Sequence, residues 1–308
     1  MSSSPVVGAP AGPSFRWLDD KAMRLFVFRS LLWPRVAARW AGFIRDFHRS
    51  FGAREPAPRV LAKPLRSYVD ARLSPARRLA ILIEHYRNFA ELFSRECVRR
   101  ICAGETIVVA ELEARKGARY CLAVAAAAKV SMQREGELAF YLFKRGQDVE
   151  LSRISLAFGR IDGELAVVVA GLQGPQGGRK REVIEATREL HGLRPKDATL
   201  LAARALAREL GARSVHAIAD RNHVLRRLQD QSKLSHYDSY WLERGAIPGG
   251  PYGFVFAPLG AVESDGKGRS AAKAAIVDGL ETFARVHSRV AAPPSCNQAL
   301  PAQRLAAA

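Results

Sequence analysis

His223 and the acidic residues near it in the sequence are the side chains that best fit acid–base chemistry. His223 comes just after a predicted strand, with Asp220 before it and Asp238 after it. A carboxylate that orients an imidazole is a common arrangement for a general base. Asp238 and Glu243 share a segment with aromatic residues, which predicts either the wall of a polar pocket or a loop anchored on the core by Trp241. The catalytic candidates are therefore His223, Asp238 and Glu243, and a structural, hydrogen-bonding role is the alternative for His223.

A second candidate site lies where a helix predicted over residues 196–211 begins. Arg194 and Lys196 stand at that point, and the free N–H groups and positive dipole end of a helix N-terminus attract anions. Two cations there favour a phosphate or carboxylate ligand. Gln173 joins them as a candidate for binding an anion or a cofactor. Helix capping and solvation of the cations explain the same pattern without a ligand.

A third candidate is an amphipathic, basic helix predicted after Pro34. Its apolar residues recur on one face, with arginines beside them, as in helices that lie on anionic membrane surfaces. The alternative is that the apolar face packs on the rest of the protein. The membrane-surface candidates are Arg35, Arg39, Trp40, Arg45 and Arg49.

Other titratable residues have simpler interpretations. Glu135 and Glu137 alternate at the start of a predicted strand and share one face of it, so solvation at a sheet edge explains them. His85 lies beside the apolar face of a predicted helix and is expected to be a core residue. The four cysteines show no CxxC spacing, and no HxH or HExxH occurs, so we expect no metal site and no disulfide framework.

The composition limits the classes of protein to consider. The chain has 308 residues, 48% hydrophobic and 25% charged, which is enough to bury a core. Its 48 Lys and Arg against 30 Asp and Glu give a net charge of +18, which favours anionic partners such as nucleic acid, anionic lipid or phosphorylated small molecules. The excess is dispersed, mostly arginine, in an alanine-rich chain. No zinc finger, RRM or basic-zipper pattern supports specific nucleic-acid binding.

Motif absences narrow the choice further. No Walker loop, GxGxxG or GxSxG is present, which disfavours NTPases, dinucleotide-binding enzymes and hydrolases. The first residues lack the pattern of a secretory signal, and no apolar run reaches the ~20 residues of a spanning helix. We therefore expect a cytoplasmic protein, at most peripheral at the inner membrane.

Strand-like segments and turn signals predict an antiparallel meander. Lys116-Gly117, Gly146-Gln147 and Asp162-Gly163 mark its turns. The five strands are predicted at residues 106–113, 119–128, 137–145, 149–159 and 164–174. Two later strands are predicted at 214–219 and 252–259.

Helices are predicted on both sides of the meander. Pro34 separates two helices within residues 17–51, a linker with three prolines follows over 51–71, and Ser74 and Pro75 begin a helix that runs to about residue 101. Later helices are predicted at 179–191, 196–211, 222–229 and 270–290. The predicted division is a disordered N-terminus (1–16), a helical region (17–105), an α+β core domain (106–260) and an Ala-rich tail, partly helical or disordered (261–308).

Short blocks spread over residues 17–260 resemble the VirK/YbjX family of Gram-negative bacteria. The blocks are KPLRSY (63–68), HY (85–86), REGEL (134–138), GLQG (171–174), TRELHGLRPK (187–196), NH (222–223) and YDSYWLERG (237–245). The resemblance implies a cytoplasmic protein that acts in virulence, envelope integrity or stress responses, including the DNA damage response. It does not supply a reaction, because the family has no established one.

The order of predicted elements also resembles the core of the GNAT-type acyl-CoA N-acetyltransferases, in which a loop-to-helix turn holds the pyrophosphate of acyl-CoA. Lys196, Asp197 and Ala198 stand where that family has glycines. The expected fold is α+β, a helical N-terminal region on a mixed, mostly antiparallel sheet with a GNAT-like core. The expected function is that of a VirK/YbjX-like accessory factor without an assigned reaction. The alternatives are an acyltransferase with acyl-CoA as cofactor and a peripheral protein that binds anionic lipid.

Overall fold

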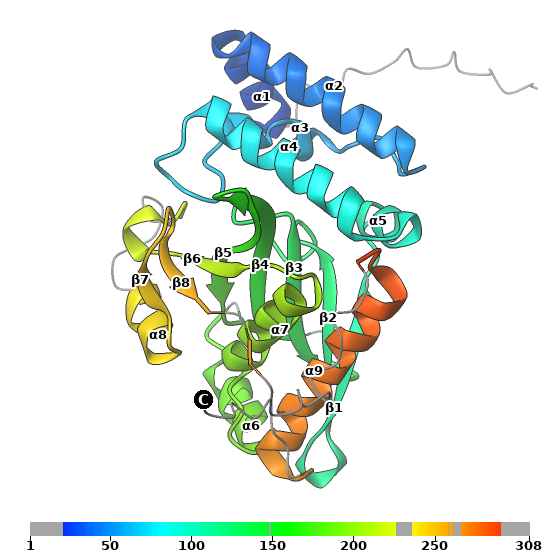
Figure 1. Ribbon diagram of the computed structural model, residues 1–308, viewed down its shortest axis with the longest axis vertical. Coiled ribbons are helices and arrows are strands. Elements are labelled where there is room, and N and C mark those ends of the chain that lie inside the picture. Colours follow the sequence, from blue (N-terminus) through cyan, green and yellow to red (C-terminus); the bar gives the residue numbers. More distant parts are fainter. Residues whose placement is uncertain are drawn as a thin grey trace, which may run out of the picture.

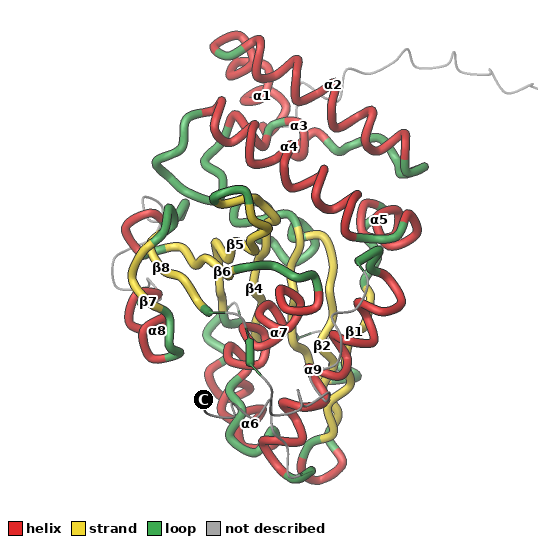
Figure 2. The backbone as a smooth tube through the Cα atoms, viewed as in Figure 1, coloured by secondary structure: helices red, strands yellow, loops and turns green. Residues whose placement is uncertain are grey.

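The centre of the protein is an eight-stranded mixed sheet (Figures 1 and 2). The computed structural model describes residues 21–147, 149–175, 177–225, 236–257, 259–260 and 266–290. The strands are β1 (Ile107–Glu113), β2 (Arg119–Ala126), β3 (Leu138–Lys144), β4 (Glu150–Ile161), β5 (Glu164–Gln173), β6 (Ser214–Ile218), β7 (Ile247–Gly249) and β8 (Gly253–Phe256). Their order across the sheet is β1-β2-β3-β4-β5-β6-β8-β7. The prediction of an α+β fold with a mixed, mostly antiparallel sheet is confirmed.

The first five strands form the antiparallel meander that the sequence predicted. At the turn between β4 and β5, Asp162 and Gly163 both have positive φ angles, 53° and 83°. Two such residues form a type I′ turn, whose twist matches that of the flanking strands. Asp and Gly tolerate this backbone conformation better than other residues, so the dipeptide was a reliable signal.

β5 and β6 form the parallel pair among the described strands, with Ala166–Val169 beside Ser214–Ala217. The chain crosses between them through α6 (Lys180–Glu189) and α7 (Pro195–Glu209). α7 packs on β3, β4 and β5 through a face of buried alanines, including Ala198, Ala202 and Ala205. Small side chains let the helix approach the sheet closely, and both predicted helices are confirmed.

The chain after β6 differs from the prediction. The 3-10 turn η4 (Asp220–Asn222) follows β6, and residues 222–225 are not in the α-helix predicted over 222–229. The rest of that predicted helix falls within residues 226–235, which lie outside the described residues. The segment expected to be a pocket wall or loop forms α8 (Tyr237–Glu243). The Asp220 carboxylate accepts the N–H groups of Tyr237 (2.9 Å) and Asp238 (3.2 Å). A residue 17 positions upstream therefore caps this helix, a contact that no local pattern announces.

Four helices form a layer at one end of the sheet (Figure 1). They are α1 (Lys21–Leu32), α2 (Pro34–Ser50), α4 (Pro75–Leu92) and α5 (Arg95–Cys102). Pro34 separates the first two, as predicted, and the Ser74 hydroxyl caps α4 by accepting the Arg77 N–H at 3.4 Å. The helix predicted to run on to residue 101 is interrupted, because Phe93 is extended and the Ser94 hydroxyl caps α5.

Residues 51–71 are not the extended linker that their prolines predicted. They contain α3 (Pro58–Leu61) and the 3-10 turn η2 (Lys63–Leu65), and Leu65, Tyr68 and Val69 are buried. Pro58 and Pro64 occupy the first turns of these short elements, where the missing N–H costs nothing. The segment is thus part of the core between the helical layer and the sheet.

The apolar face of α2 packs inward, against α3 and α4. Trp40 is 0% exposed, and its Nε1 donates to the Val60 carbonyl at 2.8 Å. The alternative that this face packs on the protein is therefore correct, and Trp40 is not available to a membrane. The other membrane-surface candidates, Arg35, Arg39, Arg45 and Arg49, are exposed.

A last helix, α9 (Gly268–His287), packs on β1 and α7. It buries Ile276, Leu280 and Phe283. Gly279 allows the close approach to β1, because a Cβ there would lie 2.5 Å from the Val109 carbonyl oxygen. The helix predicted at 270–290 is thus present and completes the core, whereas residues 291–308 lie outside the described residues. No helix in the described ranges has the length and apolar content needed to cross a membrane.

Candidate functional site

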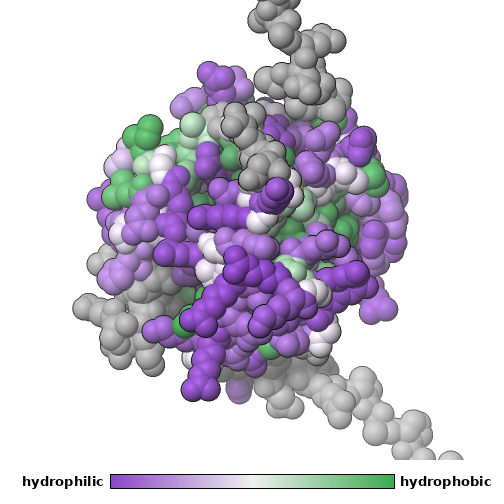
Figure 3. Space-filling view, turned by 90° about the horizontal axis from the view of Figure 1, so that it is seen from below, coloured by the Kyte–Doolittle hydropathy of each residue, from purple (hydrophilic) through white to green (hydrophobic). Residues whose placement is uncertain are grey.

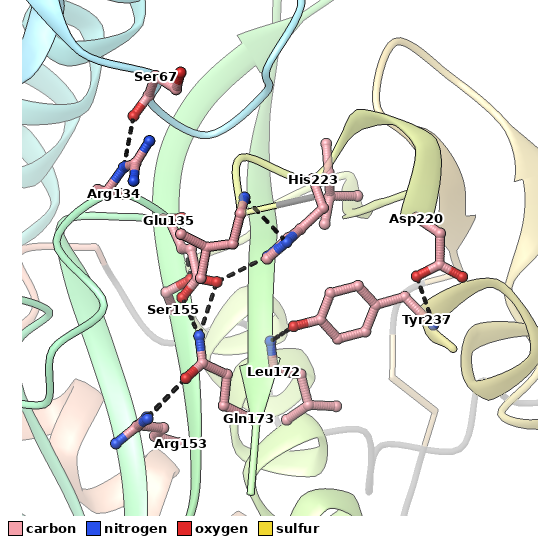
Figure 4. A network of polar contacts seen from close by, with 12 residues as sticks. Ser67, Arg134, Glu135, Arg153, Ser155, Leu172, Gln173, Asp220, His223 and Tyr237 are labelled. Atoms are coloured by element: carbon pink, nitrogen blue, oxygen red, sulfur yellow. Dashed lines mark hydrogen bonds and ion pairs between the residues drawn. The ribbon is translucent and has the colours of Figure 1, made fainter. Parts of the chain in front are cut away.

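Glu135 is the centre of a buried polar network between the sheet and the segment after β6 (Figure 4). Its Oε1 lies 2.8 Å from His223 Nε2. Gln173 Nε2 donates to both carboxylate oxygens, at 2.9 and 2.8 Å. Glu135 is 1% exposed and His223 3%. An unpaired carboxylate would be very unfavourable at such burial, and these two partners compensate for its desolvation.

Neighbouring groups hold this network in place. Arg153 Nη2 donates to Gln173 Oε1 at 2.7 Å, which leaves the amide nitrogen pointing at Glu135. The Ser155 hydroxyl donates to the Glu135 carbonyl at 3.0 Å. Gly171 makes room for the carboxylate, because a Cβ there would lie 2.5 Å from Glu135 Cδ. The first residue of the GLQG block is therefore a glycine because any side chain there would overlap the Glu135 carboxylate.

The hydrogen bonds of His223 define its tautomer. The Leu225 N–H points at His223 Nδ1 at 3.4 Å, so Nδ1 accepts and Nε2 carries the proton given to Glu135. The ring also packs edge-on against Tyr237, with centroids 5.0 Å apart. His223, a catalytic candidate by sequence, is thus oriented by Glu135 rather than by Asp220 or Asp238. It is a buried member of a carboxylate–imidazole pair.

Glu137 forms a second buried network on the side of the helical layer. Lys63 Nζ lies 2.5 Å from Glu137 Oε1, and the Tyr86 hydroxyl donates to Oε2 at 2.7 Å. Both members of the ion pair are nearly inaccessible. They lie on a cavity of about 460 Å³ between the helical layer and the sheet, which His85 and Cys102 also line. Burial raises the pKa of the Cys102 thiol to about 12, so this thiol stays protonated at neutral pH.

The interpretation of Glu135 and Glu137 as solvated edge residues was wrong. Both precede β3 and are buried, because partners from distant segments enclose them. The signal that pointed to them is the resemblance itself. Residues from six of its seven blocks meet in these two networks, namely Lys63, His85, Tyr86, Glu135, Glu137, Gly171, Gln173, His223 and Tyr237.

The seventh block leads to a separate cavity at the start of α7. This cavity measures about 530 Å³ and has mostly apolar walls, including Val183 and Ile184 of α6. Arg194 and Lys196 line it, as does Gly174, the residue after β5. Lys196 Nζ stands 5.9 Å from the centre of the Tyr240 ring. The two predicted cations therefore share one cavity, whereas Gln173 belongs to the Glu135 network.

Asp197 shows how the charges at this terminus are balanced. It accepts Arg244 Nε at 2.6 Å and the Tyr240 hydroxyl at 2.8 Å, so its charge is neutralised locally. Burial, and then the charge of Arg244, lower the pKa of Lys196. A bound anion would oppose both effects, because it would favour the charged ammonium.

The other two catalytic candidates do not join His223. Asp238 Oδ1 accepts the Asp220 N–H at 2.7 Å, in a reciprocal arrangement with the Asp220 cap of α8. Glu243 is exposed and pairs with Arg244 at 2.6 Å. Both acids have partners within the fold, and their catalytic role stays a prediction.

α8 packs where the pairing between β5 and β6 ends, after Val169 and Ala217. The Tyr237 hydroxyl accepts the Leu172 N–H at 3.2 Å, on the part of β5 beyond its pairing with β6. Trp241 Nε1 donates to the Ile218 carbonyl at the end of β6, at 2.9 Å. Backbone groups that the parallel ladder leaves unpaired are therefore satisfied by side chains, and this explains the buried aromatic pair of the YDSYW block.

Comparison with known proteins places these features in a family. Residues 16–262 match the family described as "Protein of unknown function (DUF535)". The chain is 25% identical over 240 residues to the "Uncharacterized protein YbjX" of Escherichia coli (strain K12), which covers 76% of this chain and 72% of that protein. No solved structure matches the chain. The match over most of the chain confirms the predicted resemblance: this protein belongs to the DUF535 family, the family of the VirK/YbjX proteins.

Proposed function

We propose that the protein binds a phosphorylated thioester of the acyl-CoA type at the start of α7, in a core arranged as in the GNAT acyltransferases. The observation that carries the proposal is the cavity of about 530 Å³ in which Arg194 and Lys196 stand beside the first turn of a 15-residue helix. Two cations at the positive end of a helix suit a phosphate, and the apolar walls suit an acyl or pantetheine chain.

The topology supports this position for a ligand. Gly174 follows the carboxyl end of β5 and lines the cavity, and α7 leads from there to the parallel strand β6. In sheets with parallel strands, ligands bind outside the carboxyl ends, where the crossover connection begins. The likeness to the GNAT arrangement is one of element order, and a shared fold does not by itself establish an activity. The proposal therefore rests on the cavity and its charges.

The proposal covers binding and assigns no catalytic base. His223 is enclosed by Glu135 and Tyr237 and does not line the cavity with Arg194 and Lys196. Asp197 is neutralised by Arg244, so it does not repel an anion as a free carboxylate would. The residues that would hold the phosphates are Arg194 and Lys196.

Isothermal titration of the full chain with acetyl-CoA and with a long-chain acyl-CoA tests the proposal. The expected result is saturable binding that the double variant R194A/K196A weakens about tenfold or more, since each charge-assisted contact contributes about 1.5–3 kcal/mol. The exposed Arg213, just before β6, provides the control R213A, which should bind as the wild type does. Absence of binding at millimolar ligand, or equal affinity in R194A/K196A, rejects the proposal.

We also propose that the protein acts in the cytoplasm in virulence, envelope or stress responses, including the DNA damage response. The support is membership of the VirK/YbjX family. A deletion strain, tested for survival with a cationic antimicrobial peptide and with a DNA-damaging agent, examines this role. Complementation by the wild-type gene but not by R194A/K196A would connect the role to the α7 cavity. A deletion without effect under either condition would contradict it.

A further inference from the structure

Four arginines from separate parts of the chain gather where α1, η2 and α4 meet the loop before β3. Arg29 Nη1 donates to the Leu65 carbonyl at 3.1 Å, and Arg134 Nε lies 3.5 Å from the Ser67 carbonyl. The two acceptor residues, Leu65 and Ser67, are the chain neighbours of Arg66. Arg78, on the first turn of α4, completes the group, and all four side chains are half-buried. We call Arg29, Arg66, Arg78 and Arg134 the arginine cluster.

The arginine cluster forms no ion pair within the described part of the chain, although the charge of Glu135 acts favourably on Arg134. None of the four pairs with a carboxylate there within 4.0 Å. Glu135, the acid next to Arg134 in sequence, is committed to His223 and Gln173. Half-buried guanidinium groups without a paired counter-charge destabilise the fold, and an external anion would offset that cost.

Two further observations point to a ligand. The Nε atom of Arg78 is buried and makes no hydrogen bond, although a buried donor normally has a partner. The pKa values of Arg66, Arg78 and Arg134 are all lowered, first by burial and then by neighbouring arginines, with the charge of Arg29 acting on each. The charge of Arg29 thus opposes the charges of the other three, and an anion bound beside it would offset that repulsion.

We propose that the arginine cluster is a binding site for a phosphate group that carries two negative charges. Guanidinium forks match the oxygen atoms of phosphate in bidentate geometry, and several of them around one site favour a dianion over a single carboxylate. The site is distinct from the α7 cavity. α1 lies at the top of Figure 1 and α6, which lines that cavity, at the bottom.

The phosphate has two sources to be distinguished, a soluble phosphate compound and a phospholipid headgroup. The lipid source is worth testing because α1 exposes large apolar side chains on either side of Arg29 and just after α1 ends. They are Val27, Phe28, Leu31, Leu32 and Trp33, of which Leu31 is 76% exposed. By contrast, the face at the opposite end of the molecule is mostly hydrophilic, with hydrophobic residues only in small separate areas (Figure 3).

The test uses the full chain, the double variant R29Q/R78Q and the control R77Q. Arg77 is the exposed neighbour of Arg78 on the same helix. R77Q therefore removes one positive charge close to the arginine cluster but outside it. Inorganic phosphate and pyrophosphate are titrated by calorimetry, and vesicles of phosphatidylcholine with or without phosphatidic acid are tested by co-sedimentation. Thermal unfolding with and without phosphate shows whether each variant folds and whether ligand binding stabilises it.

The expected result is that phosphate binds the wild type and R77Q and raises their thermal midpoints, and that R29Q/R78Q binds about tenfold more weakly or worse. Without ligand, R29Q/R78Q should unfold at or above the wild-type midpoint, because repulsion within the cluster is reduced. Tighter binding to phosphatidic acid vesicles than to free phosphate identifies the lipid source, and the reverse identifies a soluble one. Binding that R29Q/R78Q and R77Q reduce equally, or no binding to any of these probes, overturns the proposal.

Discussion

His85 offers a measurable link between burial and the pH dependence of stability. It lies on α4 against the sheet, where its Nδ1 accepts the Phe158 N–H at 2.9 Å and its ring stacks on Phe158 with an interplanar angle of 6°. Burial lowers the pKa of His85 from 6.5 to about 4, while Glu137 raises it and Lys63 lowers it to smaller extents. The folded protein therefore holds this ring neutral over a pH range in which the unfolded chain protonates it.

The sign and size of the effect follow from linkage. Between pH 6.5 and pH 4 the unfolded state binds more protons at His85 than the folded state does, so the free energy of unfolding falls as the pH falls. The contribution is fully present above the unfolded pKa. A shift of this size makes it about 3 kcal/mol in total, of which about 2 kcal/mol is lost by roughly pH 5.

The variants H85N and H85L separate the titration from the packing. Asn retains an acceptor for the Phe158 N–H without a titratable group, whereas Leu removes both. Urea unfolding of the wild type and both variants between pH 8 and pH 5 gives the free energy of unfolding at each pH. At pH 8 both variants should be less stable than the wild type, because they lose the stacked ring. The difference between wild type and H85N should shrink by about 2 kcal/mol on going to roughly pH 5.

A difference between wild type and H85N that stays constant over this range would refute the reasoning. It would mean that the ring is protonated in the folded protein with nearly its ordinary pKa, and hence that the interface between α4 and β4 admits water. Titration of the remaining histidines and carboxylates is common to both proteins, so it cancels in the comparison.

Two further predictions concern the buried carboxylates. Gly171→Ala should lower the free energy of unfolding by about 1–3 kcal/mol, because the new Cβ would lie 2.5 Å from Glu135 Cδ. Gly159→Ala should lower it far less, because the nearest atom to its new Cβ is 3.8 Å away. Equal losses of stability in urea unfolding would contradict this prediction. Lys63→Met should cost about 3–5 kcal/mol by leaving the Glu137 carboxylate buried without its cation. Adding Glu137→Gln should recover part of that loss, and a single variant as stable as the wild type would show that the ion pair is not needed.

The five-stranded meander was predictable because its signals are local, whereas the short edge strand β7 was not predicted. Each strand of the meander coincides with a short run of apolar or alternating apolar and polar residues. Turn dipeptides such as Asp162-Gly163 separate these runs. The helix that begins at Ser74 was equally predictable from its cap and from Pro75. These patterns determine backbone conformation within a few residues, so no distant contact was needed to recognise them.

The errors occur where a distant residue decides the conformation. The segment 51–71 has the composition of a linker, but Tyr68 and Val69 are buried under the helical layer. α8 forms because Asp220 caps it and Trp241 reaches the end of β6. Both outcomes depend on contacts between segments that the sequence separates, so local propensity could not reveal them.

The candidate sites divide in the same way. The start of α7, with Arg194 and Lys196, was found from sequence because a helix terminus is a local feature. The partner of His223 was missed, because Glu135 lies 88 residues away along the chain. Arg29 and Arg78 were missed for a similar reason, since nothing in their sequence neighbours indicates that they meet.

The sequence alone determined the five-stranded meander, most of the long helices, the family and one cationic helix start, because propensity, turn chemistry and characteristic blocks act over a few neighbouring residues. Only the tertiary structure decided which charges are neutralised. A carboxylate such as Glu135 or a guanidinium such as Arg78 takes its character from the groups within a few ångströms of it. Those groups come from segments that only folding brings together. In the described part of the chain they pair the buried acids and leave the arginine cluster without an ion pair.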